Sequence, residues 1–337
     1  MKKRSFESVF QSFERLRVLV IGDVMVDAYV WGNVTRISPE APVPVVNVKK
    51  REKRLGGASN VALNVKALGA QVTICSVIGE DAYDVGLIEL LKNHCISDKG
   101  ILISKERVTT IKERIIAGSQ HVVRVDSEID TPISEKETFQ LLEKIQKLIS
   151  DTDVIIFEDY DKGVITPSLI KEVVKEANLK NVPTAVDPKK RNFWAYHGVT
   201  LFKPNLKELR EGIKTEISAE NIDEIKRAVH VLKENMNVQI ALVTLSEQGV
   251  FISNSKEEHY IPAHLRQIAD VSGAGDTVIS IAALCLAEKL PLKYIAGIAN
   301  LGGGLVCEKP GVVPVDKRQL LSETIRVYGK EIASEVL

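Results

Sequence analysis

The residues best suited to chemistry lie at positions 270–277, where two aspartates, Asp270 and Asp276, flank a turn containing Gly273 and Gly275. An apolar run follows at residues 278–287, so the pattern predicts a glycine turn leading into the N-terminus of a buried helix. Glycine permits backbone conformations that a Cβ forbids, and the free N–H groups at a helix N-terminus attract anions. The stretch therefore predicts an anion site.

A carboxylate inside an anion site requires an explanation, because it repels the anion. Asp276 is explained if it acts as a general base. It would take a proton from an alcohol while the N–H groups hold the charge of a phosphoryl group in transfer. The simpler alternative is a helix with an aspartate in its first turn, which the helix dipole favours. The presence of Asp270 favours the first interpretation, because two carboxylates then crowd the same turn.

A second pair of candidate carboxylates follows the first predicted strand. Residues 17–22 are apolar and end in glycine, as is typical of a buried strand, and Asp23 and Asp27 come after it. Ligands of open α/β sheets bind beyond the carboxyl ends of the strands, where carboxylates can accept hydrogen bonds from sugar hydroxyls. The alternative is a pair of solvated turn aspartates.

Two adjacent glycines, Gly56 and Gly57, lead into another predicted helix. Asn60 lies in the first turn of that helix, where its amide can reach a ligand. A plain turn with a helix cap accounts for the glycines. A close approach of the backbone to a sugar accounts for them equally well.

Strands and helices alternate through the rest of the chain, which predicts a mostly parallel sheet covered on both faces. Ser134 and Glu137 predict a capping box, and Thr166 with Pro167 predicts another helix start. The expected strands are 72–78, 153–157, 182–186 and 240–245, and the expected helices are 84–93, 134–149, 167–178 and 218–235.

Polar clusters follow three of these strands, at residues 158–163, 187–189 and 203–208. Loops after strands are the usual positions of binding residues in such folds, so each cluster is a candidate part of a site.

Two stretches, 28–48 and 107–126, lack helical periodicity and predict extended strands outside the main sheet. Together they predict a small β-sheet lid. Its uncovered apolar face would mark a partner surface, and we expect a homodimer through the lid. The residues expected on that face are Val43, Val45, Ile111, Ile115 and Val123.

Composition excludes several classes of function. The 45 basic and 45 acidic residues give no net charge, whereas non-specific nucleic-acid binding needs a basic surplus. The four cysteines form no C-x-x-C pair, which suits a reducing compartment, and we expect a cytoplasmic protein without a signal peptide. No apolar stretch approaches the roughly 20 residues that span a bilayer. P-loop and G-x-G-x-x-G motifs are absent, so a nucleotide would have to bind in another way.

The stretch 270–276 resembles the D-[TS]-x-[GA]-A-G-D signature of the ribokinase (PfkB-type) carbohydrate kinases. The Gly-Gly-Ala-Ser-Asn stretch at 56–60 lies over 200 residues before it, in the order that family shows. The resemblance implies a ribokinase-like three-layer α/β/α fold with a mostly parallel central sheet and a small β-sheet lid, as one kinase domain over residues 1–337.

Within that family, the segments 22–27, 36–46, 159–163, 204–208 and 244–249 are similar to those of heptose kinases. These enzymes phosphorylate O1 of D-glycero-β-D-manno-heptose 7-phosphate with ATP in ADP-heptose and lipopolysaccharide core synthesis. No H-x-G-H motif of a fused nucleotidyltransferase is present, so we expect a stand-alone kinase. One departure is that glycines occupy 302–304, where heptose kinases usually have alanines.

The resemblance also assigns roles, position by position. Asp276 corresponds to the base, and Gly273, Ala274 and Gly275 correspond to the anion hole. Asn205 and Glu208 correspond to the motif that orders Mg2+ and the ATP phosphates. Thr244, Ser246, Gly249 and Asn300 correspond to the nucleotide side, and Asp270 and Ser272 to a monovalent cation site for K+. The sugar site comprises Asp23, Asp27, Gly56, Gly57, Asn60, Asp159 and Lys162.

The distal phosphate of such a substrate would need cations away from the Gly273 turn. Lys112 and Arg114 are two residues apart, so they share one face of a strand, and Arg124 lies on the returning strand. These three predict a phosphate clamp, with Lys162 and Lys189 as further candidates. Three solvated charges are the alternative. For the whole chain, the alternatives are a kinase of another sugar or sugar phosphate and a catalytically silent sugar-binding protein.

Overall fold

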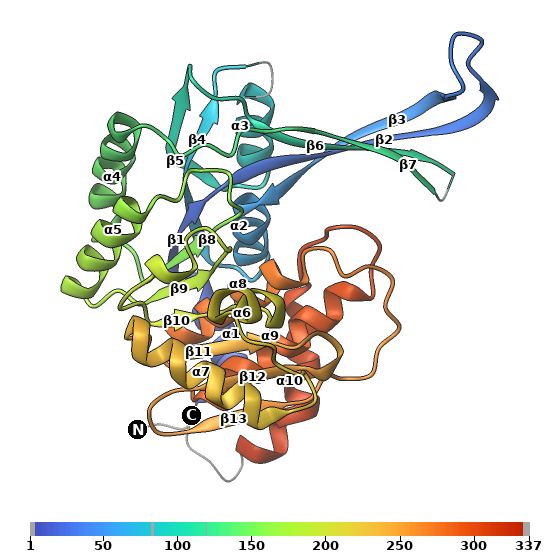
Figure 1. Ribbon diagram of the computed structural model, residues 1–337. Helices are drawn as coiled ribbons and strands as arrows, with labels where there is room; N and C mark the ends of the chain where they lie inside the picture. The colour runs from blue at the N-terminus through green and yellow to red at the C-terminus, as the bar shows by residue number, and fades with distance from the viewer. Residues whose placement is uncertain (1–3, 82–83, 119, 333–337) are drawn as a thin grey trace.

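The computed structural model describes residues 4–81, 84–118 and 120–332 of the chain (Figure 1). In this described part, nine strands form the main sheet in the order β13-β12-β11-β10-β9-β8-β1-β4-β5. Seven of them run parallel: β1 (Arg17–Gly22), β4 (Gln71–Gly79), β5 (Ser97–Ser104), β8 (Val154–Glu158), β9 (Thr184–Asp187), β10 (Leu201–Phe202) and β11 (Ile240–Thr244). The strands β12 (Val250–Ser253) and β13 (Glu258–Ile261) are antiparallel at one edge.

Helices cover both faces of this sheet because the strand residues alternate between two apolar cores. In β1, Val18 and Val20 belong to one core and Leu19 and Ile21 to the other. The first core includes α1 (Phe6–Ser12), α2 (Ala58–Ala67), α3 (Asp84–Asn93), α8 (Ala274–Ala287), α9 (Leu292–Cys307) and α10 (Lys317–Ile332). The second includes α4 (Glu135–Ile149), α5 (Pro167–Leu179), α6 (Leu206–Ile213) and α7 (Ile222–Met236). Short 3-10 turns occupy Phe13–Arg15, Phe193–Ala195 and Ser246–Gln248.

The predicted layered architecture is therefore confirmed, and so are its local signals. Ser134 and Glu137 form the expected capping box at α4, and Thr166 caps α5 with Pro167 in its first turn. Within the described residues, no helix combines the length and the apolar character needed to cross a lipid bilayer.

A second sheet has the order β3-β2-β6-β7 and reaches away from the body in Figure 1. Its strands are β2 (Val24–Ile37), β3 (Pro44–Gly57), β6 (Thr110–Ala117) and β7 (Gln120–Ser127). The first two are longer than the predicted 28–48, and they run from the end of β1 to the start of α2. The second sheet is thus continuous with the two segments that carry Asp23 and Asn60.

The expected apolar face of the second sheet needs one correction. Ile111 is 5% exposed and packs in the first core, because it lies where β6 leaves the body. Val43 precedes β3 and is exposed, and Val123 is exposed together with its neighbour Val125. The exposed apolar surface therefore lies toward the outer part of the sheet.

Packing explains the glycines of α9. A Cβ at Gly302 would lie 2.0 Å from Ile281 Cδ1, and one at Gly303 would lie 2.8 Å from Val278 Cγ2. Since both partners belong to α8, these glycines allow α9 to pack closely against that helix. The position of α8 matters because its first turn carries Asp276.

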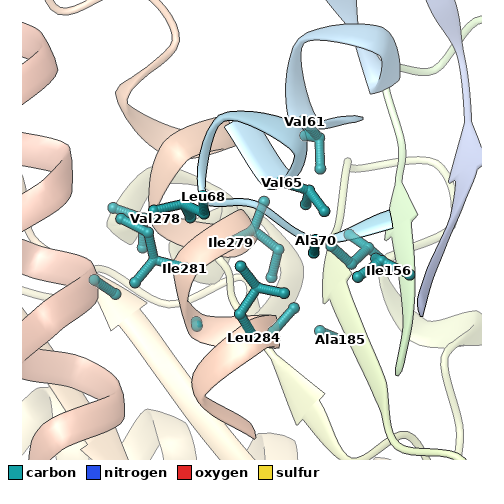
Figure 2. Close-up of a cluster of buried hydrophobic side chains, with 14 of the residues drawn as sticks. Val61, Val65, Leu68, Ala70, Ile156, Ala185, Val278, Ile279, Ile281 and Leu284 are labelled. Atoms are coloured by element: carbon teal, nitrogen blue, oxygen red, sulfur yellow. The ribbon is translucent and has the colours of Figure 1, made fainter. Parts of the chain in front are cut away.

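The helix α8 also packs on α2 across a buried apolar cluster (Figure 2). Val61 and Val65 of α2 lie beside Ile279 of α8 and near Ile156 of β8. All four side chains are fully buried. Interiors of this kind are as densely packed as organic crystals, so α2, α8 and the end of β8 hold one another in place.

Candidate active site

The proposed base, Asp276, lies in the first turn of α8. Its N-cap residue Gly273 has φ +78, a conformation that favours glycine, so this part of the predicted turn is confirmed. Gly275 differs from the expectation, because its φ is not positive and a Cβ there would make only ordinary contacts at 3.7 Å. The first N–H groups of a helix have no intrahelical acceptors, so the turn at 273–276, including Ala274, offers donors to an anion.

Hydrogen bonds between α2 and α8 fix the orientation of the base. The amide of Asn60 donates to Asp276 Oδ2 at 2.7 Å. One turn along, Thr277 Oγ1 donates to Asn64 Oδ1 at 3.1 Å, and Ser280 Oγ donates to the Val61 carbonyl at 3.2 Å. These polar groups are buried, so the contacts hold the two helices in one register.

The other oxygen of the base has a partner that the sequence did not identify. The hydroxyl of Tyr160 donates to Asp276 Oδ1 at 2.8 Å. Tyr160 belongs to the polar cluster after β8, which was predicted to carry binding residues through Asp159 and Lys162 instead.

Three buried carboxylates, Glu158, Asp187 and Asp276, form what we call the carboxylate cluster. Their facing oxygens lie within 4.8 Å of one another. The buried ammonium of Lys203 lies 2.8 Å from Asp187 Oδ2 and offsets part of the negative charge. Both carboxylate oxygens of Glu158 are buried without a hydrogen-bond partner among the described residues. Glu158, Asp187 and Lys203 end or follow β8, β9 and β10, so the parallel sheet gathers them at its carboxyl edge, where Asp276 joins them from the first turn of α8.

Burial controls the electrostatics of this cluster. It raises the pKa of Asp276, and the nearby charge of Asp187 adds to the increase, while the hydrogen bonds from Asn60 and Tyr160 lower it. Burial also raises the pKa of Glu158 well above its ordinary value, with Asp187 and Asp276 adding to the effect. The hydrogen bonds from Asn60 and Tyr160, together with the charge of Lys203, therefore favour the ionised form of Asp276.

Two predicted sugar ligands have internal roles. The carboxylate of Asp23 accepts backbone N–H bonds from Tyr160 at 2.8 Å, Lys162 at 3.2 Å and Val164 at 3.0 Å. It therefore holds the loop at 160–164, whereas we had expected it to bind sugar hydroxyls.

Asp159 is similarly enclosed, being 1% exposed. Its carboxylate accepts hydrogen bonds from Asn192 and Tyr196, each at 3.0 Å, and from the Asp161 N–H at 2.9 Å. Burial, together with the charge of Asp23, raises the pKa of Asp159 to about 6. Its carboxylate is therefore occupied by internal partners, whereas the sequence predicted a sugar ligand.

Asp27 lies where the second sheet meets the body. Its carboxylate forms an ion pair with Arg114 of β6. A Cβ at Gly56 would lie 2.3 Å from Asp27 Oδ2, and Gly57 has φ +56. The glycine pair is therefore required by the close approach of β2 and β3, a packing reason that differs from both the plain turn and the sugar contact considered from the sequence.

The cations proposed for a distal phosphate differ in how they are paired. Arg114 pairs with Asp27, and Arg124 donates to Asp126 at 3.0 Å. Lys112 has no ion pair within the described residues. Strand pairing places Lys112 opposite Asp27 and Arg124 opposite Arg114, so all three cations face the same side.

The two further candidates have carboxylate partners. Lys162 Nζ lies 2.8 Å from Glu128 Oε1, and Lys189 Nζ lies 2.6 Å from Glu208 Oε1. One more cation, Arg54 of β3, was not predicted, and its guanidinium stacks 4.9 Å from the centroid of the Tyr29 ring. The guanidinium of Arg114 stacks on the same ring at 5.4 Å.

The proposed nucleotide residues are brought together at the opposite end of the site. Asn205 forms a parallel bridge with Thr244, which places the two motifs side by side. Asn205 and Glu208 also form a capping box at α6, with reciprocal bonds of 2.8 Å. Ser246 and Gly249 both have positive φ in the adjoining turn.

The remaining predicted residues are Asp270 and Ser272, which precede the Gly273 turn, and Asn300 of α9. Asp270 accepts N–H bonds from Ser272 at 2.9 Å and from Gly311 at 3.0 Å. Asn300 donates to the Pro262 carbonyl at 2.9 Å. Asp270 therefore links Gly311 to the segment that leads into the Gly273 turn.

Comparisons with known proteins show which proteins the chain is similar to. A family model described as pfkB family carbohydrate kinase matches residues 15–318. The chain is 37% identical to the bifunctional protein HldE of Trichlorobacter lovleyi, covering 100% of this chain and 70% of the relative. It is 41% identical to HldE of Wolinella succinogenes, covering 90% and 63%. The chain thus spans about two thirds of the length of these relatives.

Solved structures show the same fold. Phosphofructokinase-2 from Escherichia coli in complex with potassium has a TM-score of 0.76 at 18% identity, covering 91% of this chain and 99% of that one. Ribokinase from Arabidopsis thaliana complexed with ribose and ATP has a TM-score of 0.69 at 17% identity, covering 91% and 98%.

Proposed function

The chain belongs to the pfkB family of carbohydrate kinases, and we propose that it transfers the γ-phosphoryl group of ATP to O1 of D-glycero-β-D-manno-heptose 7-phosphate. The product would be the 1,7-bisphosphate, made in the cytoplasm for ADP-heptose and lipopolysaccharide core synthesis. The observation that carries this proposal is Asp276, buried in the first turn of α8 after the Gly273 turn and hydrogen-bonded by Asn60. The identity to HldE proteins supports a heptose as the sugar.

In the proposed reaction, Asp276 accepts the proton of the sugar hydroxyl as its oxygen bonds to the γ-phosphorus. The bond from that phosphorus to the bridging oxygen breaks, and ADP leaves with the electron pair. The N–H groups of residues 274–276 would stabilise the phosphoryl oxygens during transfer. The buried hydrogen bonds between α2 and α8 would keep the base oriented, so that it need not reorient during the reaction.

Glu208 fits a role in holding Mg2+. Its Oε1 already lies 2.6 Å from the ammonium of Lys189, which shows that this position stabilises a cation. Magnesium prefers oxygen donors and is usually shared between one or two carboxylates and substrate phosphates, whose charge it neutralises. Asp270 and Ser272 are the proposed K+ residues, and a structural relative was solved with potassium.

The face of the second sheet that carries Asp27 would bind the sugar phosphate as a lid. Lys112, Arg114 and Arg124 lie on this face beside Asp27. The carboxylate of Asp27 would accept a hydrogen bond from a sugar hydroxyl. Lys112 has no ion pair within the described part of the chain, so it can meet a phosphate without breaking one. We therefore propose Lys112 as the first of the three cations to test as a ligand of the distal phosphate.

The opposite face of the second sheet would form a homodimer. Val123 and Val125 are 46% and 47% exposed there, close to half-buried Ile115. Exposed apolar surface of this kind marks a partner site. Light scattering at micromolar concentration should give twice the chain mass, and Val123→Glu with Val125→Glu should give the monomer mass. A monomeric wild-type protein would contradict this part of the proposal.

The experiment that tests the function is a panel of sugars with ATP, each sugar offered with and without its distal phosphate. ADP release should be fastest with the heptose 7-phosphate and much slower with heptose. Fast turnover of a different sugar or sugar phosphate would support the alternative kinase assignment. The absence of ADP release with every sugar would support a catalytically silent binding protein.

A further inference from the structure

The surroundings of Asp276 are unfavourable for a charged base. Asp276 is 6% exposed, and oxygens of Glu158 and Asp187 lie within 4.8 Å of its carboxylate. Buried carboxylates at this spacing repel one another, and one of them then tends to hold a proton. A base that is already protonated cannot accept the proton of a sugar hydroxyl, so the site needs donors that stabilise the ionised form.

The nearby cations do not supply a bond to Asp276. Lys203, from the end of β10, lies 2.8 Å from Asp187, and Lys189 lies 2.6 Å from Glu208. The two donors that reach the carboxylate of the base are Asn60 from α2 and Tyr160 from the loop after β8. Each takes one oxygen, at 2.7 and 2.8 Å respectively.

Tyr160 is itself held at three points. Its backbone N–H donates to Asp23 Oδ2 at 2.8 Å, its ring lies 5.4 Å from the ammonium of Lys189, and its hydroxyl reaches Asp276. Asp23 also binds the N–H groups of Lys162 and Val164. The buried aspartate at the end of β1 therefore fixes the loop from which the tyrosine projects.

We propose that Tyr160 is a positioning residue for the catalytic base, and that Asp23 acts through it. The tyrosine hydroxyl orients the Asp276 carboxylate and keeps it ionised at neutral pH, in spite of the neighbouring Glu158 and Asp187. The inference depends on the proposed function, because it takes Asp276 as the proton acceptor. It gives Tyr160 a role that the sequence did not predict, and it gives Asp23 a positioning role in place of the sugar contact that the sequence predicted.

The sign of the effect follows from the contacts. A hydrogen bond donated to a carboxylate lowers its pKa, because it stabilises the charged form. Removal of the Tyr160 hydroxyl should therefore raise the pKa of Asp276, which burial and the charge of Asp187 already raise and which the Asn60 amide and the charge of Lys203 would still lower. Activity that needs the ionised base would then be lost at a higher pH than in the wild type.

The test is the pH dependence of kcat/KM for Tyr160→Phe, with heptose 7-phosphate as substrate and ADP measured directly. We expect the midpoint of the acid limb to move up by about one to two pH units, the equivalent of one charge-assisted hydrogen bond. On the alkaline plateau, kcat should remain within about tenfold of wild type, since the base itself is intact.

Tyr196→Phe is the matched control. Tyr196 is also fully buried, and its hydroxyl donates to a buried carboxylate, that of Asp159, at 3.0 Å. The two variants remove the same atom from similar surroundings, so their thermal midpoints should fall by similar amounts. The acid limb of the control should stay at the wild-type pH.

Asp23→Asn provides a second variant that acts through the loop. An asparagine keeps one acceptor oxygen and places an amide donor against the backbone N–H groups, so the acid limb should move in the same direction by a smaller amount. An unmoved limb in Tyr160→Phe, or equal loss of kcat/KM at every pH, would overturn the inference and leave the tyrosine with a packing role. Lack of kinase activity in the wild type would instead refute the proposed function.

Discussion

The carboxylate cluster and the cationic face of the second sheet both gather charged side chains, but they do so in opposite ways. In the cluster, Lys203 and Asp187 are almost fully buried and form a direct ion pair. On the second sheet, the Arg124 side chain is 58% exposed, and Lys112 has no ion pair within the described residues. Breaking a buried pair costs about 3–5 kcal/mol, whereas an exposed pair contributes about 0–1 kcal/mol.

This difference separates the two tasks of a kinase. The cluster holds its groups in fixed positions, as a reaction step requires. Lys112 and Arg124 can exchange partners at little cost, as the capture and release of a charged substrate require, whereas Arg114 is paired with the buried carboxylate of Asp27. Substitutions in the first region should therefore affect turnover, and substitutions in the second should affect the KM for the sugar phosphate.

The largest effect is expected from Asp276→Asn, which removes the base. A general base contributes about 10²–10⁴-fold, so kcat should fall by at least about two decades. ATP should still bind with its normal affinity, as measured by calorimetry, because the Gly273 turn remains. Turnover close to that of the wild type would show that Asp276 is not the base.

Alanine at Lys112, Arg114 or Arg124 should act mainly on the sugar phosphate. A charge-assisted hydrogen bond is worth about 1.5–3 kcal/mol, so the KM for the sugar phosphate should rise roughly 10- to 150-fold at the true ligand. The KM for ATP should hardly change. We expect Arg114→Ala also to lower kcat, because it leaves the buried carboxylate of Asp27 without its partner.

The matched control for these variants is the sugar without its distal phosphate. Its KM should be the same for the Lys112→Ala variant and the wild type, since the lost contact is to the phosphate. An unchanged KM for the sugar phosphate in all three variants would place the phosphate site elsewhere. Arg54, whose guanidinium stacks on Tyr29 together with that of Arg114, would then be the next residue to test.

Glu208→Gln tests the boundary between the two kinds of region. Glu208 is 9% exposed and forms an ion pair with Lys189, so its position is fixed as in the carboxylate cluster. Its proposed ligand, however, is Mg2+ that arrives with ATP, so it also takes part in binding. The Mg2+ concentration for half-maximal rate should rise by about tenfold or more, because a neutral amide is a poorer ligand than a carboxylate. The KM for the sugar should change little. A magnesium dependence equal to that of the wild type would exclude the role.

Much of the fold could be predicted from the sequence because its signals are local. The apolar alternation of the parallel strands, the box at Ser134 and the glycine pair before α2 all act over a few residues. The elements that were not predicted include the strand β5 and the helix α6. The polar residues of these two elements hide the apolar ones that pack, such as Ile101 and Leu209.

The candidate site was predicted less completely, for a different physical reason. The cluster at 158–163 was correctly placed after a strand, but the sequence favoured Asp159 and Lys162, whereas Glu158 and Tyr160 face the base. Consecutive side chains at the end of a strand point in opposite directions. If the strand ends one residue later than expected, the other set of side chains reaches the site. Lys203 was also missed, because a lysine seldom lies fully buried unless it has a partner, and its partner Asp187 is distant in sequence.

The smallest effect on activity is expected from a comparison of the two capping boxes. This comparison also tests what Asn205 and Glu208 do. Ser134 with Glu137 caps α4 on the surface, and Asn205 with Glu208 caps α6 beside Thr244 and Lys189. Loss of an N-cap side chain costs about 1 kcal/mol, so Ser134→Ala and Asn205→Ala should lower the stability to urea by similar amounts.

Their kinetics should differ. Ser134→Ala leaves the site untouched, so its KM for ATP at fixed Mg2+ should equal that of the wild type. In the wild type, the backbone N–H of Asn205 donates a hydrogen bond to the Glu208 carboxylate at 2.8 Å, and the Asn205 side chain accepts one from the Glu208 N–H, also at 2.8 Å. The first bond depends on the cap geometry that the second maintains, so Asn205→Ala frees the Glu208 side chain to rotate. The KM for ATP should therefore rise several-fold. If both variants lose only stability, the motif in this chain is a helix cap and magnesium is ordered by other groups.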